Sequence, residues 1–223
     1  MKHQRSNFTL LELLAVIAII AVLAGLLLPA VNKGYDRART TTCLNNQKQV
    51  TAMISAYMND ANGCFYSTGS QSWAIPLNKR NLAADVKVFR CPSIPNYTQN
   101  SFDPADFAND ATQIYGAVGH DDGFDFRGTK YLYTTGSNPV QISPSMLMLG
   151  ACTVNSSKSP TYKLAFDNDG KPFQIHNSRS LCNIFFLDGH SETLNQADFQ
   201  KKYYPNLTGT GATKASSITY FEE

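Results

Sequence analysis

One long apolar run near the start of the chain, from Phe8 to Leu28, dominates the pattern of hydrophobic and polar positions. As an α-helix, this run of about 21 residues would measure about 31 Å and match the hydrocarbon thickness of a bilayer. Its one ionisable side chain is that of Glu12. A carboxylate inside a membrane is unfavourable unless it has a partner or a function. The run therefore predicts a transmembrane helix in which Glu12 has a specific role.

A second, amphipathic pattern follows the apolar run. One stripe at helical spacing consists of Cys43, Gln47, Val50, Ile54 and Tyr57. Charged and polar residues occupy the other faces: Asp36, Arg37, Arg39, Asn45 and Lys48. We expect the helix to continue to about Asp60 and to stop at Asn62-Gly63. Together the two patterns predict one rod, whose second half (residues 30–60) packs against a globular head.

The remainder of the chain predicts short strands and long loops. Strands are expected at Tyr131 to Thr134, Met146 to Gly150 and Tyr162 to Phe166. The clearest hairpin joins residues 183–187 to residues 190–194 through Asp188-Gly189, a pair typical of a tight primed turn. Residues 94–130 read as a long polar loop, and a short helix is expected near Gln196 to Tyr203. The predicted fold class is α+β, a long N-terminal helix on a small antiparallel sheet.

The apolar run has three interpretations. As a removable secretory signal it would be cut before Gly25, but it is too long for that and continues through Leu28. As a plain membrane anchor it would keep Lys2 and Arg5 in the cytoplasm, although this leaves Glu12 without an explanation. The third interpretation comes from the residues at its start.

Residues 8–14, FTLLELL, closely resemble the processing signal of type IV prepilins and type II secretion pseudopilins. The resemblance implies that a prepilin peptidase cuts between Asn7 and Phe8, removes residues 1–7 as a leader and methylates the new amino terminus. Residues 8–29 then remain as a transmembrane and filament-core helix, and Glu12 pairs with the terminal amine of a neighbouring subunit. Pro29 stands where many members carry a proline. The family usually has Gly where this chain has Asn7.

A second resemblance extends along the chain. The segments CLNNQKQV and AYMNDANG, then Trp73 and the FRCPS segment around Cys91, are similar to a pilin-like group that ends in a His-to-Asp-Gly signature. Here His176 and Asp188-Gly189 match that signature with a longer spacing. We expect them to be structural, with a hairpin turn at Asp188-Gly189 and His176 bonded to nearby backbone. No serine or cysteine nucleophile in a strand–turn–helix elbow accompanies them, so an enzyme is not predicted.

Five cysteines are present: Cys43, Cys64, Cys91, Cys152 and Cys182. In an exported domain they predict two disulfides and one remaining thiol, with a pairing that spacing does not determine. The resemblance implies Cys43–Cys91, and Cys152–Cys182 is our second expected pair. Because no two cysteines form a C-x-x-C pair, a structural zinc site is not expected.

Two acidic segments offer the oxygen donors that calcium prefers. They contain Asp121, Asp122 and Asp125, and Asp167 and Asp169. Neither has the EF-hand spacing, and both read first as solvated turns. We therefore predict no metal and no cofactor, with calcium as the alternative.

The net charge of +2 comes from Lys2 and Arg5, since without residues 1–7 the 19 basic residues fall to 17 and equal the 17 acidic ones. This balance does not favour nucleic-acid binding. The resemblance implies a single-pass protein of the cytoplasmic (inner) membrane with its head outside the cytoplasm, later part of a periplasmic or extracellular filament. Implied partners are the bilayer, the peptidase, an assembly platform with its ATPase, and other pilin-like subunits. The alternative function is an anchored or secreted binding or hydrolytic module that uses the helix for export.

Overall fold

The computed structural model describes residues 9–61, 64–65, 72–94, 114–117, 124–125, 132–135, 138–141, 145, 148–154, 171–177 and 180–203. The expected cleavage site between Asn7 and Phe8 lies outside these residues, and so does the strand expected at Tyr162 to Phe166.

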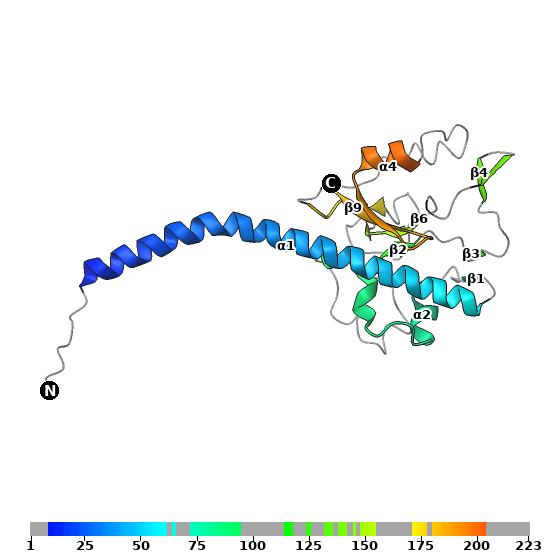
Figure 1. The fold of residues 1–223 in the computed structure, drawn as a ribbon, viewed down its shortest axis with the longest axis horizontal. Helices are drawn as coiled ribbons and strands as arrows, with labels where there is room; N and C mark the ends of the chain where they lie inside the picture. The colour runs from blue at the N-terminus through cyan, green and yellow to red at the C-terminus, as the bar shows by residue number, and fades with distance from the viewer. Residues whose placement is uncertain are drawn as a thin grey trace.

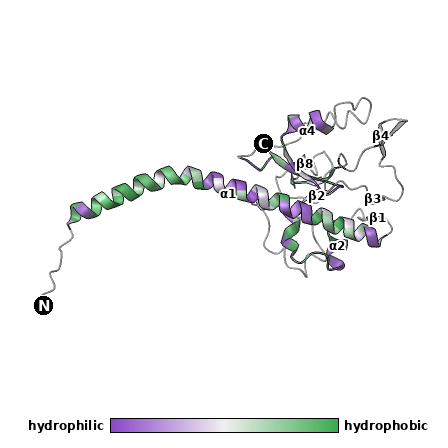
Figure 2. Cartoon of the chain, in the orientation of Figure 1, coloured by the Kyte–Doolittle hydropathy of each residue, from purple (hydrophilic) through white to green (hydrophobic). Residues whose placement is uncertain are grey.

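The rod predicted from the two hydrophobic patterns is a single helix, α1, from Leu10 to Asp60. Its 51 residues form one curved rod that projects far beyond the rest of the molecule (Figure 1). Hydropathy divides it into an apolar half and a mixed half (Figure 2). Pro29 lies inside the helix, where its lack of an N–H removes one backbone hydrogen bond.

The two halves of α1 have different environments. In the apolar half (residues 10–28) every large hydrophobic side chain is exposed, from 80% for Leu10 to 47% for Val16. In the second half Cys43, Gln47, Val50 and Ile54 of the predicted stripe are buried and Tyr57 is half-buried, while Thr51, which was not predicted, is buried beside them. The amphipathic stripe was therefore predicted correctly, and it is the surface on which the head packs.

A four-stranded antiparallel sheet lies beside this stripe, in the order β10-β9-β6-β2. Its strands are β2 (Gly116–Ala117), β6 (Met148–Ala151), β9 (Cys182–Phe186) and β10 (Ser191–Leu194). All five residues of β9 are buried, because this inner strand lies against α1. The α+β class is confirmed.

Shorter elements complete the described part of the chain. Three two-stranded ribbons pair β1 (Cys64–Phe65) with β3 (Phe124–Asp125), β4 (Leu132–Thr135) with β5 (Asn138–Gln141), and β7 (Thr153–Val154) with β8 (Lys171–Pro172). The helical pieces are α2 (Ile75–Lys79), the 3-10 helix η1 (Val86–Phe89) and α4 (Gln196–Tyr203). The helix α4 has the predicted bounds.

Two expectations need correction. Residues 94–130 are not wholly a loop, because β2 and β3 lie within them and β2 is an edge strand of the main sheet. The hairpin at residues 182–194 forms, but its turn is longer than the predicted two-residue primed turn. Among the residues at this turn only Gly189 has a positive φ, of 92°, and its N–H donates to the Phe186 carbonyl at 3.1 Å. This is the pattern of a type I turn followed by a left-handed glycine.

Aromatic residues fill the space between α1, α2, η1 and the sheet. The indole Nε1 of Trp73 donates to the Tyr115 carbonyl at 2.9 Å, and the Trp73 ring packs edge-on against Phe89. The Tyr115 ring makes an edge contact with Phe185 of β9. These contacts join the segment that contains α2 and η1 to the sheet in one core.

Candidate metal centre

Four metal-ligating side chains meet where α1 enters the head. Cys43, Cys91, Cys152 and His176 place their ligand atoms within 4.8 Å of one another. Cys43 lies on α1, Cys91 follows η1, Cys152 lies between β6 and β7, and His176 lies between β8 and β9. The three cysteines are 0% exposed and the histidine 1%. Chain segments far apart in sequence thus deliver three sulfurs and one nitrogen to a single buried point.

The distances within this cluster are similar to one another. The sulfurs of Cys43 and Cys152 are 3.4 Å apart. His176 Nε2 lies 3.5 Å from the sulfur of Cys91 and 3.5 Å from that of Cys152. Each atom is therefore a near neighbour of others in the cluster, as at the corners of a small polyhedron.

The far side of the His176 ring is held by two hydroxyl groups. Its Nδ1 lies 3.2 Å from Thr40 Oγ1 and 3.2 Å from Ser93 Oγ. The Thr40 hydroxyl donates its hydrogen to the Asp36 carbonyl at 2.8 Å, so toward His176 it can only accept. This contact places the imidazole proton on Nδ1 and leaves the lone pair of Nε2 directed at the sulfurs.

Polar groups also surround the sulfurs. The Tyr115 hydroxyl is 3.4 Å from the sulfur of Cys43, and Gln47 Nε2 is 3.8 Å from that of Cys152. The backbone N–H of Ser93 donates to Cys91. Each of these donors stabilises negative charge on sulfur. The surroundings of the cluster therefore suit thiolates.

The thiols do not titrate alike. Burial would raise the pKa of Cys43, but hydrogen bonds with the Cys152 and Cys91 thiols are the largest of the contributions that outweigh it and hold that pKa well below the ordinary value. Burial raises the pKa of Cys91 and of Cys152 well above theirs. Burial likewise raises the pKa of the Tyr115 hydroxyl, which keeps it a donor. One thiolate is thus favoured at a time, because the buried cluster holds little compensating charge.

The predicted disulfides are not present. Among the described cysteines no two are joined, and neither Cys43–Cys91 nor Cys152–Cys182 forms a bond. Cys182 lies outside the cluster and its thiol faces the Cys152 carbonyl at 3.6 Å. The reason is geometric, since Cys43 and Cys91 meet Cys152 and His176 at one point instead of meeting as an isolated pair. The side chain of Cys64 lies outside the described residues.

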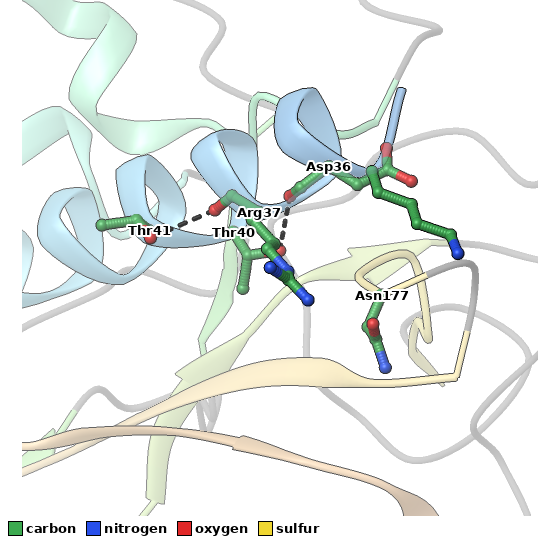
Figure 3. A pocket seen from close by; sticks show the side chains of 6 residues that line it. Asp36, Arg37, Thr40, Thr41 and Asn177 are labelled. Atoms are coloured by element: carbon green, nitrogen blue, oxygen red, sulfur yellow. Dashed lines mark hydrogen bonds between the residues drawn. The ribbon is translucent and has the colours of Figure 1, made fainter. Parts of the chain in front are cut away.

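A surface pocket of about 560 Å³ adjoins the cluster on the side nearer the apolar half of α1. It is lined by Lys33, Asp36, Arg37, Thr40, Thr41 and Asn177. Figure 3 shows Arg37 and Asn177 extending from α1 and from the facing turn. Thr40 belongs both to this pocket and to the contact with His176, so the pocket reaches a residue that holds the buried histidine.

The other predicted site residues lie elsewhere. Glu12 is in the first turn of α1, where its Oε2 accepts from the backbone N–H of Thr9 at 2.9 Å and Glu12 N–H donates to Thr9 Oγ1 at 3.3 Å. This reciprocal arrangement is a capping box. Asp188 and Gly189 form the β9–β10 turn, as expected, and the Asp188 carboxylate accepts from His190 N–H at 3.1 Å. The backbone of His176 does hydrogen-bond to nearby backbone, since its N–H donates to the Leu181 carbonyl. Its side chain, however, belongs to the cluster.

The calcium candidates fall on residues that the structure does not describe in this detail. Asp121, Asp122, Asp167 and Asp169 lie outside the described residues, and for Asp125 only the backbone, in β3, is described. That expectation stays a prediction. The described residues instead favour a metal site made of cysteines and a histidine. Such a site was not expected from the sequence, because the chain has no C-x-x-C pair.

Comparison of the chain with protein-family models, with curated proteins and with solved structures finds no match.

Proposed function

We propose that this protein is a subunit of a type IV pilus-like or type II secretion pseudopilus filament, processed before Phe8 and held in the cytoplasmic membrane until assembly. The observation that carries the proposal is the apolar half of α1. No residue from 10 to 28 is buried in the single chain, although the segment contains more than a dozen large apolar side chains. A surface of this size needs lipid or other helices around it.

The length of this half of α1 suits both a lipid bilayer and a bundle of helices. At about 1.5 Å per residue, residues 10–28 measure about 28 Å, close to the hydrocarbon thickness of a bilayer. In the part of the chain that the structure describes, α1 is a helix long and apolar enough to cross a membrane. The same side chains can pack against identical helices, so that transfer from lipid to a helical bundle keeps them away from water.

The head supports the proposal by leaving this half untouched. The sheet and the aromatic core contact only the second half of α1, where five residues between positions 43 and 54 are buried. Neighbouring subunits could therefore approach residues 10–28 without moving the head. A protein that used the helix only for export would have no need of a second half continuous with the core of the head.

Glu12 has a place in this scheme that is compatible with its capping role. The contacts to Thr9 are made by Oε2, which leaves Oε1 able to accept from a second donor. A neighbouring subunit's methylated amine would be such a donor, and pairing inside a bundle would offset the desolvation of the carboxylate. Capping and pairing can then operate at the same time.

Photo-crosslinking in living cells tests the proposal. A benzophenone amino acid placed at Val16, in the apolar half of α1, is expected to give adducts with a second copy of this chain or with another protein that carries a similar helix. Glu12→Ala should insert normally in the membrane and lose these adducts. Adducts with lipid alone, in the parent and in Glu12→Ala alike, would contradict the proposal.

Glu12→Gln separates the two roles of the carboxylate. Its amide oxygen can still accept from Thr9 N–H, so the helix cap is kept, but it has no charge for an amine. We expect Glu12→Gln to lose the protein adducts as Glu12→Ala does. Adducts at the parental level in Glu12→Gln would mean that capping is the whole role of this residue.

A further inference from the structure

We propose that Cys43, Cys91, Cys152 and His176 bind one Zn²⁺ ion, and that this ion is a structural centre joining α1 to three segments of the head. Nothing in the filament proposal requires or implies this ion.

The distances within the cluster fit a tetrahedral zinc site. Bonds of about 2.3 Å to sulfur and about 2.0–2.1 Å to nitrogen, at tetrahedral angles, place sulfurs about 3.8 Å apart and sulfur and nitrogen about 3.6 Å apart. The two sulfur-to-nitrogen distances at His176 Nε2 are 3.5 Å, and the Cys43–Cys152 sulfur distance is 3.4 Å. All four ligand atoms lie within 4.8 Å. Small side-chain shifts therefore give the complete coordination geometry.

The orientation of His176 suits a metal ligand. A neutral imidazole binds a metal through one nitrogen while the other donates to an oxygen that fixes the ring. Thr40 Oγ1 and Ser93 Oγ supply that oxygen at Nδ1, and the Thr40 hydroxyl hydrogen is committed to the Asp36 carbonyl. Nε2 is thus prepared as a ligand before any ion arrives.

The surroundings of the cluster also suit the charge of a zinc centre. When Zn²⁺ binds, the protons still carried by the three thiols leave to solvent, and the resulting centre of one Zn²⁺ and three thiolates has a net charge of −1. A buried negative charge needs nearby donors. Tyr115, Gln47 and the Ser93 N–H provide one donor for each of the three sulfurs.

A disulfide explains this arrangement less well. It would use two of the three sulfurs, bring them from 3.4 Å to about 2.05 Å, and leave the third sulfur and an oriented histidine without a purpose. Four protein ligands and complete burial also leave no position for water or substrate, which is the mark of a structural and not a catalytic zinc site. Tetrahedral sulfur and nitrogen ligands favour zinc over the harder divalent ions.

The test is metal analysis of the full-length protein. It is purified from membranes in a mild detergent, without chelators and with a tag that contains neither histidine nor cysteine. Plasma mass spectrometry should find about one zinc per chain. Cys91→Ser and His176→Ala should each reduce the zinc content at least about tenfold. Cys182→Ser is the matched control, because this buried thiol lies beside the cluster but outside it, and it should retain zinc at the parental level.

A cobalt spectrum keeps the test decisive if Cys91→Ser or His176→Ala fails to fold. The parent protein, stripped and reloaded with Co²⁺ under reducing conditions, should show the thiolate charge-transfer and strong visible bands of tetrahedral cobalt. His176→Cys should keep four ligands and bind Co²⁺ with a shifted spectrum.

Three results would overturn the proposal. The first is a parent protein that binds neither zinc nor cobalt under reducing conditions. The second is another metal at full occupancy, and the third is a Cys43–Cys152 disulfide in most of the protein as isolated.

Discussion

The sulfur atoms of Cys43 and Cys152 lie 3.4 Å apart although the two residues are 109 positions apart in the chain. Cys43 belongs to α1 and Cys152 to the connection between β6 and β7, so this contact joins the long helix to the sheet. A cross-link at this point would hold the head at a fixed position along α1. In a filament, force applied to the head would then reach the helical core through the cluster as well as through the apolar packing.

Thr40→Val tests how strongly the orientation of His176 affects zinc binding. Valine is close to threonine in shape but has no oxygen to accept from Nδ1, so the ring loses one of its two supports. We expect zinc affinity to fall about tenfold, and further when Ser93→Ala is added. Competition with a zinc-binding dye on the full-length protein measures this change.

Thr41→Val is the control for that substitution. Thr41 is exposed, and its hydroxyl donates to the Arg37 carbonyl at 3.1 Å. The zinc affinity of Thr41→Val should equal that of the parent. Equal affinities for Thr40→Val and Thr41→Val would show that Thr40 does not position the ring.

Gly150 allows β2, β6 and β9 to approach one another. A Cβ at this position would lie 2.3 Å from the Gly116 carbonyl oxygen and 2.5 Å from the Phe185 ring, and neither backbone nor a packed aromatic ring can yield easily. We expect Gly150→Ala to lower the free energy of unfolding by about 2–3 kcal/mol. Trp73, the single tryptophan and 2% exposed, reports unfolding by its fluorescence in denaturant titrations.

Gly34→Ala is the matched control on α1. A Cβ there meets nothing within 4 Å, and alanine favours helix more than glycine does. Its unfolding midpoint should equal or slightly exceed that of the parent. A loss of stability in Gly34→Ala as large as in Gly150→Ala would mean that the close approach of the strands is not the cause.

Asp188 gives the β9–β10 turn a dependence on pH. Burial would raise the pKa of this carboxyl, but hydrogen bonds from the His190 side chain and backbone outweigh it and lower the pKa. Because the pKa is lower in the folded than in the unfolded protein, the ionised carboxylate stabilises the fold at a pH above the unfolded pKa of about 3.9. This stabilisation is lost as the pH falls through the folded pKa. Asp188→Asn should therefore lower the free energy of unfolding by about 0.5–1 kcal/mol at pH 5.

The same comparison at low pH completes this test. Both proteins lose any bound metal equally on acidification, so the difference between them isolates the carboxylate. Urea titrations followed by Trp73 fluorescence should show that difference shrinking below about pH 4. A difference that is constant from pH 5 to pH 2.5 would exclude the carboxylate as its source.

Local patterns predicted the elements that depend on local chemistry. The helix α1 follows from an apolar run joined to an amphipathic stripe, and it ends at Asp60 as expected. The β9–β10 hairpin also follows from the Asp188-Gly189 turn pair, and α4 lies where a short helix was expected. The strand β2 did not, because two residues, Gly116 and Ala117, carry no periodicity and pair only through the folded sheet.

The cluster could not be predicted because its ligands share no local spacing. Zinc motifs are recognised by ligands a few residues apart, whereas here Cys43, Cys91, Cys152 and His176 come from separate elements. Sequence resemblance had singled out Cys43, Cys91 and His176, but as a disulfide and a structural histidine. A buried cysteine on the helical stripe, together with a histidine in a signature, was the available signal. Only the fold shows that they meet.

The N-terminus of the membrane-resident protein tests the filament account most directly. Mass spectrometry of its first peptide should find N-methylated Phe8, because the account requires cleavage after Asn7 and retention of the whole apolar half of α1. A protein that begins at Gly25 would have lost most of that half, and one that begins at Met1 would be an uncut anchor. Either of these two results would contradict the account.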